Sequence, residues 1–318
     1  MKKFLAMIFC ICLSLGAYGG TVSAFEATGT VTLVVPFSAG GAVDLGARLF
    51  ARYAAQYTSA NIVITNISGA GGIIGPAEVL RHGTDGSHMI ALNPSLGYVS
   101  TADRPVPFDI TKDFVFCAMM VRDSRKLAIR KGDPRFSNVE EFIEYARANR
   151  GVTVGSSGAG TVAHFTPTLI SNKLDLGLRV VAFDGTGEAR AALLGGHIDA
   201  LSLSGSESVV MLAQDQIVVI INAAAERSTD PLFADVPTSV ELGADVRLWT
   251  SRGFAFRAGT NESIIAYWSG IFEKVTSNAD FLAAARDVGL PIYFMEHKAA
   301  NEAAAVEMRL FEELMASM

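Results

Sequence analysis

Three glycine-rich segments carry the residue types that could bind a small ligand, and each follows a predicted strand and precedes a predicted helix. The first, residues 34–44, reads VVPFSAGGAVD, and the third, residues 155–164, reads GSSGAGTVAH. In open α/β sheets such loops lie at the carboxyl ends of strands, where ligands bind and free backbone N–H groups face outward. Glycines let the backbone approach a ligand closely, and a helix start carries partial positive charge. These two segments therefore predict a site for a small anion.

Polar side chains in the two segments divide between structural and ligand-binding roles. Asp44 falls in the first helical turn, and we favour a structural role, bonding loop amides and offsetting the helix dipole, over ligand contact. The third segment offers the hydroxyls of Ser156, Ser157 and Thr161 before a helix start. Neutral donors there suit a carboxylate, since each hydrogen bond to a charged oxygen contributes about 1.5–3 kcal/mol. We favour ligand contact for this loop, and loop support over ligand contact for His164.

The second glycine-rich segment, NISGAGGIIG at residues 66–75, approximates a dinucleotide fingerprint. Its spacing is G-x-G-x-x-x-G, it follows the second strand, and the next strand lacks an acidic residue at its end. We therefore favour a structural turn beside the cleft over a nucleotide site. The third segment has neither the Gly-Lys-Ser/Thr of a Walker loop nor the G-x-S-x-G of a hydrolase.

Catalytic and metal-binding patterns find no support in the sequence. The five histidines show neither the i, i+4 spacing of a helical zinc pair nor a companion cysteine cluster. Asp184, Glu188 and Asp199 could form an acid/base set, but loop and strand-end positions explain them as well. We predict no catalytic residue, no metal site and no cofactor.

Residues 1–24 have the pattern of a secretory signal, with a charged start and a small-residue end at residues 22–24. Their apolar stretch is about 12 residues long, shorter than the roughly 20 of a membrane-spanning helix. We expect cleavage before Phe25 or Glu26 and export to the periplasm. Lipidation is disfavoured because Cys10 and Cys12 lie inside the apolar stretch.

The charge of the chain argues against nucleic-acid partners. Removal of residues 1–24 takes away two lysines and no acid, so the net charge changes from −6 to −8. An acidic chain without a basic run does not suit nucleic acid or an anionic membrane. Of the three cysteines only Cys117 remains, in an apolar run, which predicts a buried thiol and no internal disulfide.

The segments between these loops predict an α/β fold. Short β-branched runs alternate with longer segments of helical period, which is typical of parallel sheets covered by helices. Without residues 1–24, 294 of the 318 residues remain, and one core usually stops growing at about 250–300, so two lobes are expected. We place the crossings in the polar or glycine-containing stretches 121–126 and 243–250. Residues 25–122 with 249–318 then form lobe 1, and residues 123–248 form lobe 2.

Taken together, seven segments resemble the substrate-binding proteins of the tripartite tricarboxylate transporter family, the Bug-type periplasmic solute receptors. Each segment is weak alone, but their order and spacing are specific, and they cover essentially the whole mature chain. They are VVPFSAGGAVD (34–44), NISGAGGIIG (66–75), DGSHM (85–89), PFDITKDF (107–114), GSSGAGTVAH (155–164), FDGTGEARAALLGGHID (183–199) and DVPTSVELG (235–243).

The resemblance implies a non-catalytic periplasmic binding protein with a ligand cleft between two lobes, each a mostly parallel sheet flanked by helices. It implies a small organic carboxylate as ligand, either a di- or tricarboxylate or an aromatic carboxylate, and a membrane permease as partner. We expect a monomer, and the alternative is an exported α/β enzyme acting on a carboxylate. The expected ligand-binding residues are Phe37, Ser38, Ala39, Gly40, Asp44, Ser95, Tyr98, Ser156, Ser157, Thr161, His164, Phe183, Gly185 and Ser204.

Overall fold

The computed structural model describes residues 25–99 and 106–316, so the predicted signal at residues 1–24 lies outside the described residues. The strands are β1 (Thr30–Val35), β2 (Asn61–Asn66), β3 (His88–Leu92), β4 (Phe114–Arg130), β5 (Thr153–Ser157), β6 (Arg179–Phe183), β7 (Ala200–Ser204), β8 (Ile217–Ala223), β9 (Trp249–Arg257) and β10 (Ile292–Glu296). The helices are α2 (Ala42–Ala54), α3 (Ile74–Val79), the 3-10 helix η1 (Pro94–Val99), α4 (Ile110–Asp113), α5 (Val139–Ala148), α6 (Val162–Leu174), α7 (Thr186–Leu194), α8 (Gly205–Ala213), α9 (Glu262–Thr276), α10 (Ala279–Asp287) and α11 (His297–Ala316). Within the described ranges, no helix is long and apolar enough to cross a bilayer.

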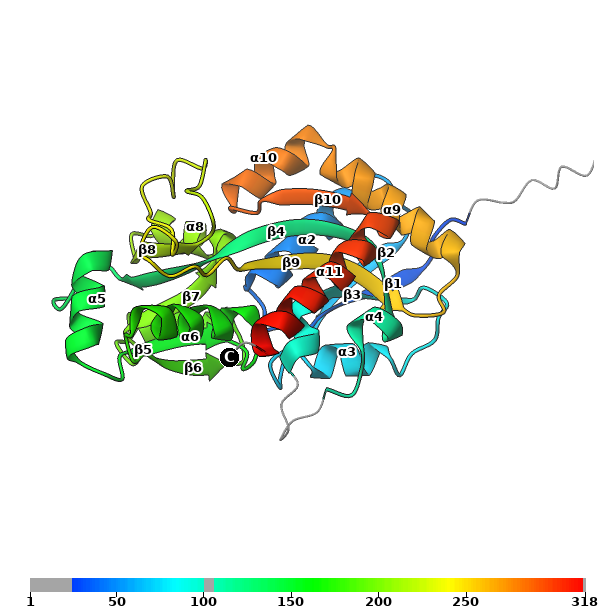
Figure 1. The fold of residues 1–318 in the computed structure, drawn as a ribbon. Helices are drawn as coiled ribbons and strands as arrows, with labels where there is room; N and C mark the ends of the chain where they lie inside the picture. The colour runs from blue at the N-terminus through cyan, green and yellow to red at the C-terminus, as the bar shows by residue number, and fades with distance from the viewer. Residues whose placement is uncertain (1–24, 100–105, 317–318) are drawn as a thin grey trace, which may run out of the picture.

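The strands form a curled sheet in the order β2-β1-β3-β9-β4-β7-β5-β6, with β8 and β10 also paired to β4. Strand β1 is parallel to β2 and β3, and β5 is parallel to β6 and β7. Helices flank both parts, so that β1–β3 with α2 and α9 lie in one lobe and β5–β7 with α5 and α6 in the other (Figure 1). This arrangement confirms the predicted two-lobed α/β fold.

Strand β4 runs through both lobes. Its residues Phe114–Ser124 pair antiparallel with β9, and from Arg125 onward it pairs with β7 and β8. The polar stretch 121–126 is therefore part of a continuous strand and not a break in secondary structure. Its backbone groups stay hydrogen-bonded to neighbouring strands, which satisfies them where the chain is buried. The lobe boundaries at residues 122 and 249 stay a prediction.

The core of the first lobe forms around aromatic rings. Helix α2 places Phe50 against Phe272 of α9 with ring centroids 3.7 Å apart, and Phe254 of β9 packs beside both. Cys117 of β4 is fully buried in this cluster, and its thiol donates to the Phe254 carbonyl. Burial raises the pKa of this thiol, which keeps it neutral. The prediction of a buried, unpaired thiol at Cys117 is confirmed.

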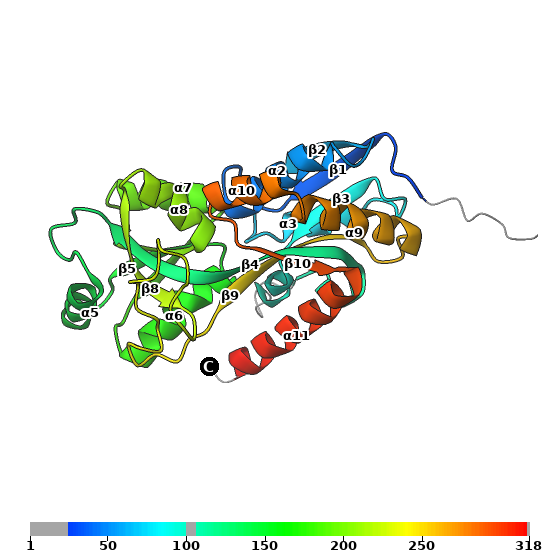
Figure 2. The same ribbon diagram turned by 90° about the horizontal axis from the view of Figure 1, so that it is seen from above.

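Helix α11 joins the two lobes. Ala300 and Ala304 near its start pack in a cluster of first-lobe residues, whereas Phe311 packs with second-lobe residues such as Phe142 and Ile170. Figure 2 shows α11 running from the first lobe toward the second along one side of the molecule. The final segment therefore contacts both lobes rather than the first alone.

Asn278, at the N-cap of α10, is expected to contribute measurably to stability. Its Oδ1 accepts from the amides of Asp280 and Phe281, and its Nδ2 donates to the Tyr57 hydroxyl. Asn278→Ala should lower the free energy of unfolding by about 1–2 kcal/mol, the usual effect of losing such a cap. Urea unfolding measures this change. Tyr57→Phe removes only the second contact, and an equal loss in that variant would contradict the capping role.

Candidate functional site

A narrow cleft with a volume of about 40 Å³ lies between the lobes. Residues from the first lobe and from the second lobe line it together, so it depends on the way the lobes face each other. The lining residues are Phe37, Ser38, Gly41, Ala42, Val43, Asn93, Ser95, Leu96, Arg125, Ser157, Thr161, Val162, Ala163, Thr186, Glu207, Thr250 and Arg252.

Three helices, α2, α6 and α7, begin at this cleft without a side-chain cap. Their N-cap residues are Gly41, Thr161 and Gly185, and none of them makes a side-chain hydrogen bond to its helix. Among the described residues, the amides of Val162 and Ala163 have no acceptor. By contrast, α5, α8, α9 and α10 are all capped by Asn or Ser side chains. The N-termini of α2 and α6 thus leave amides free to bind an anion in the cleft.

The loops around the cleft touch across the lobes. A Cβ placed on Gly185 would lie 3.0 Å from the Ser38 side chain, and one on Gly158 would lie 3.2 Å from the Gly71 Cα. Gly158 also has a φ of 80°, which L side chains rarely adopt. The lobes are therefore closed over the cleft, and these glycines permit the close approach.

The serine-rich loop contributes to the cleft through only some of its predicted residues. Ser157 and Thr161 line it, and the Thr161 hydroxyl donates to the carbonyls of Ser157 and Gly158, which fixes the turn of the loop. Ser156 is buried behind the loop, with its Oγ 3.4 Å from Nδ1 of His164. Burial lowers the pKa of His164, so the neutral imidazole is favoured.

Asp44 lies behind the first loop rather than in the lining of the cleft. Its carboxylate accepts from the Gly40 amide at 2.9 Å, from Arg48 Nε at 2.9 Å and from Asn66 Nδ2 at 3.0 Å. Burial raises the pKa of Asp44, but these hydrogen bonds outweigh it and leave the pKa below its ordinary value. The geometry agrees with the structural role that we favoured for this carboxylate.

The other predicted ligand-binding residues differ in whether they line the cleft. Phe37, Ser38 and Ser95 line the cleft directly. The side chain of Tyr98 lies outside the described residues. The remaining ones surround the cleft without lining it: Ala39, Gly40, Phe183, Gly185 and Ser204.

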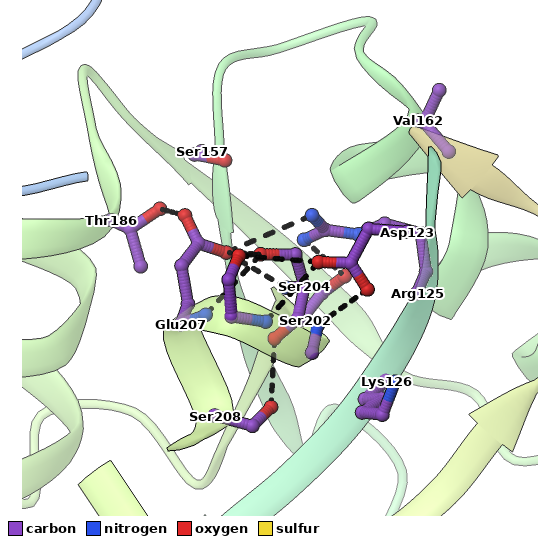
Figure 3. A network of polar contacts seen from close by, with 12 residues as sticks. Asp123, Arg125, Lys126, Ser157, Val162, Thr186, Ser202, Ser204, Glu207 and Ser208 are labelled. Carbon is purple, nitrogen blue, oxygen red and sulfur yellow. Dashed lines mark hydrogen bonds and ion pairs between the residues drawn. The ribbon is translucent and has the colours of Figure 1, made fainter. Parts of the chain in front are cut away.

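Two charged pairs at the floor of the cleft were missed by the sequence reasoning. Arg125 Nη1 lies 3.8 Å from Glu207 Oε2, and Arg252 Nη1 lies 3.6 Å from Asp123 Oδ2. Figure 3 shows Arg125 directed toward Glu207 at the start of α8. Burial lowers the pKa of Arg125, against the opposing effect of Glu207. The available signal was the presence of four charged residues at positions 122–126 between two apolar runs.

The second glycine-rich segment forms a turn against the first loop. A Cβ on Gly72 would lie 3.0 Å from the Phe37 ring, and one on Gly75 would lie 2.9 Å from Pro36. These contacts support a structural turn beside the cleft. Within residues 25–99 and 106–316, no group of three His, Cys, Asp or Glu side chains is placed to hold a metal ion.

Residues 47–316 match the family model described as a tripartite tricarboxylate transporter family receptor. The chain belongs to this family. The receptor is 29% identical to a UPF0065 protein of Pseudomonas sp. strain P51 over 82% of this chain and 77% of that protein. Among curated relatives it is also 26% identical to the protein BugT of Bordetella pertussis, over 82% of this chain and 81% of BugT. These findings confirm the resemblance and identify a solute-binding protein, not an enzyme.

Solved structures share the fold of this receptor. MatC from Rhodopseudomonas palustris, solved with bound malate, has a TM-score of 0.77 and 28% identity, covering 91% of this chain and 97% of MatC. The periplasmic binding protein BugD has a TM-score of 0.84 at 21% identity and covers 92% of this chain and 98% of its own. The two-lobed architecture is therefore that of periplasmic binding proteins.

Proposed function

We propose that this receptor captures a small organic carboxylate in the periplasm and delivers it to a membrane permease of the tripartite tricarboxylate type. The observation that carries the proposal is the pair of uncapped helix N-termini, α2 and α6, at one closed cleft. Free amides and the positive ends of two helix dipoles favour a carboxylate over a neutral or cationic solute. The malate bound to the related MatC agrees with this choice of ligand.

The proposal assigns ligand contact to the predicted residues that line the cleft. Ser38 and Ser157 offer hydroxyl groups that can donate to a carboxylate, Thr161 stands beside the free amides at the start of α6, and Phe37 supplies an apolar wall. A di- or tricarboxylate or an aromatic carboxylate would suit these walls. We further propose that residues 1–24 are a cleaved signal, and that the receptor acts as a monomer with lobes 25–122 plus 249–318 and 123–248.

A Val162→Pro variant tests the role of the α6 amides. Val162 is the first residue of α6, where proline is tolerated because its missing N–H has no partner within the helix. The preceding residue, Thr161, already has the extended backbone that proline requires. Loss of one hydrogen bond to a charged oxygen should weaken carboxylate binding about 10- to 100-fold, measured by calorimetry.

The matched control is Ala279→Pro, at the first position of α10, which does not line the cleft. Carboxylate affinity in this variant should equal that of the wild type. A thermal-shift screen of di-, tri- and aromatic carboxylates identifies the ligand first, since about 100 times the dissociation constant adds about 2.7 kcal/mol of stability. If no carboxylate raises the melting temperature, or if Val162→Pro binds as tightly as Ala279→Pro, the proposal is wrong.

A further inference from the structure

Two buried arginines face the cleft from the two strands that connect the lobes. Arg125 on β4 is 3% exposed and Arg252 on β9 is 5% exposed, and both line the cleft. Arg252 lies within the paired part of β4 and β9, opposite Val121. Arg125 lies just beyond that paired part, which ends at Ser124. The two guanidinium groups therefore come from opposite sides of the crossing between the lobes.

The carboxylates paired with these arginines, Asp123 and Glu207, accept their hydrogen bonds from backbone amides and hydroxyl groups. Asp123 accepts from the amides of Gly205 and Ser206 at 2.9 and 3.1 Å, at the start of α8. Glu207 accepts from the Ser204 amide at 2.7 Å and the Thr186 hydroxyl at 2.6 Å. Each carboxylate is thus well satisfied without its arginine, which stands beyond hydrogen-bond distance at 3.6 or 3.8 Å.

The arginine donors consequently lack acceptors. Within the part of the chain that the structure describes, Nε of Arg125 and both Nε and Nη1 of Arg252 are buried without a hydrogen-bond partner. The contact of Arg125 with Ser202 Oγ is long, at 3.4 Å. Buried guanidinium groups with open donors are unfavourable unless an acceptor completes them. The acceptor that suits the planar fork of arginine is a carboxylate.

The charges beside the cleft balance, so the open donors are what call for an acceptor. Arg125 and Arg252 face two carboxylates, those of Glu207 and Asp123. Lys126 does not line the cleft, since its ammonium lies over the Phe233 ring, donates to Ser124 and is attracted by Asp230. The unpaired N–H groups of the two arginines, and not a surplus charge, therefore favour an acceptor in the cleft.

We propose that Arg125 and Arg252 bind a second carboxylate of the ligand, so that this receptor selects small dicarboxylate dianions over monocarboxylates. The proposal rests on the proposed function, in which the N-termini of α2 and α6 hold the first carboxylate. The dianion then spans the cleft from the helix starts to the floor formed by β4 and β9. Because the two arginines come from opposite sides of the crossing, the second carboxylate also ties the lobes together.

Calorimetry with chain-matched acids tests the proposal on the wild-type protein. The pairs are succinate with butyrate, glutarate with pentanoate, and adipate with hexanoate, which differ in one carboxylate and little in length. At least one dicarboxylate should bind 30-fold or more tightly than its partner, because two guanidinium groups lose their acceptor in the monoacid. Equal affinity within every pair overturns this inference and leaves the proposed function standing. Absence of binding by all six acids also overturns this inference, and it overturns the proposed function only if no tricarboxylate or aromatic carboxylate in the thermal-shift screen binds either.

Arg252→Met and Arg125→Met, which keep the length of the side chain and remove its charge, assign the selectivity to these residues. Each should weaken the preferred dicarboxylate at least 30-fold and change its monocarboxylate partner less than threefold. Arg122→Met is the control, since Arg122 lies on the same strand, is exposed and stacks over Trp249 at 4.0 Å. Equal weakening of both acids in the two test variants, or unchanged dicarboxylate affinity, contradicts the assignment. Should those variants not fold, Arg252→Lys retains the positive charge but lacks the planar guanidinium group. Its loss of dicarboxylate affinity should be smaller than the loss expected for Arg252→Met.

Discussion

Replacing Glu307 with glutamine is expected to stabilise the protein by about 3 kcal/mol above pH 7 and to leave its stability near pH 4.5 almost unchanged. Glu307 lies on α11, is 5% exposed, and its Oε1 has no partner among the described residues. Burial raises its pKa from 4.5 to about 7, against smaller opposing effects of Ser251, Trp249 and Arg122. The folded state therefore binds more protons than the unfolded state between these two pH values. The stability that this group provides is full below pH 4.5 and is lost as the pH rises through 7.

Urea unfolding of the wild type and of Glu307→Gln at pH 5 and pH 8 measures this effect. The two proteins should differ little at pH 5 and by about 3 kcal/mol at pH 8, because glutamine cannot ionise. Glu302→Gln, at an exposed position of the same helix, is the control and should follow the wild type at both pH values. A constant difference between wild type and Glu307→Gln over this range would show that Glu307 does not titrate in it.

Gly253→Ala is expected to destabilise the protein by about 2–3 kcal/mol, because the centre of the sheet has no room for a methyl group. Gly253 lies on β9 between β3 and β4, opposite Leu92 and Met119. A Cβ there would lie 2.6 Å from the Phe116 ring and 2.9 Å from the Ala118 carbonyl oxygen. The carbonyl belongs to the backbone of a paired strand, so it cannot move away without disturbing the ladder.

Gly270→Ala provides the opposite case in the same lobe. Gly270 lies inside α9, and a Cβ built on it meets nothing within 4 Å. Alanine should raise stability there by about 0.5–1 kcal/mol, because it restricts the unfolded chain and favours the helix. Thermal unfolding compares the two variants. An equal loss of stability in Gly270→Ala and Gly253→Ala would show that the room available for a Cβ atom does not decide the effect.

The sequence patterns predicted most regular elements because those elements follow local periodicity. The β-branched runs TVTLVV at residues 30–35 and RVVAF at residues 179–183 form β1 and β6. The segment of helical period before Gly195-Gly196 forms α7, and Gly196 has a left-handed φ of 73°, which suits the end of a helix. The elements that were not predicted include α8 and β10. Strand β10 is short, and its pairing with the distant β4 decides it more than its own propensity. Helix α8 begins with a local capping box of Ser204 and Glu207, a signal that the sequence reasoning missed.

The glycine-rich loops beside the cleft could be predicted for the same reason, whereas its buried charged residues could not. Loops that follow strands and open helices can be recognised locally, and three residues predicted on them, Ser38, Ser157 and Thr161, line the cleft. Arg125 and Arg252 are 127 positions apart in the numbering of the chain. They meet only because β4 and β9 pair across both lobes, and sequence reasoning had interpreted residues 121–126 as a break.

By itself, the sequence determined an α/β chain with glycine-rich loops at the ends of strands. It also determined that the helices after these loops begin with amides that suit an anion. Both follow from periodicity and backbone chemistry, which are local properties. Only the tertiary structure decided which of those loops face one cleft, and that Asp44 supports its loop from behind. It also decided that two arginines are buried at the cleft floor with open donors. Burial and charge balance depend on which distant residues come together, and no short segment of the chain contains that information.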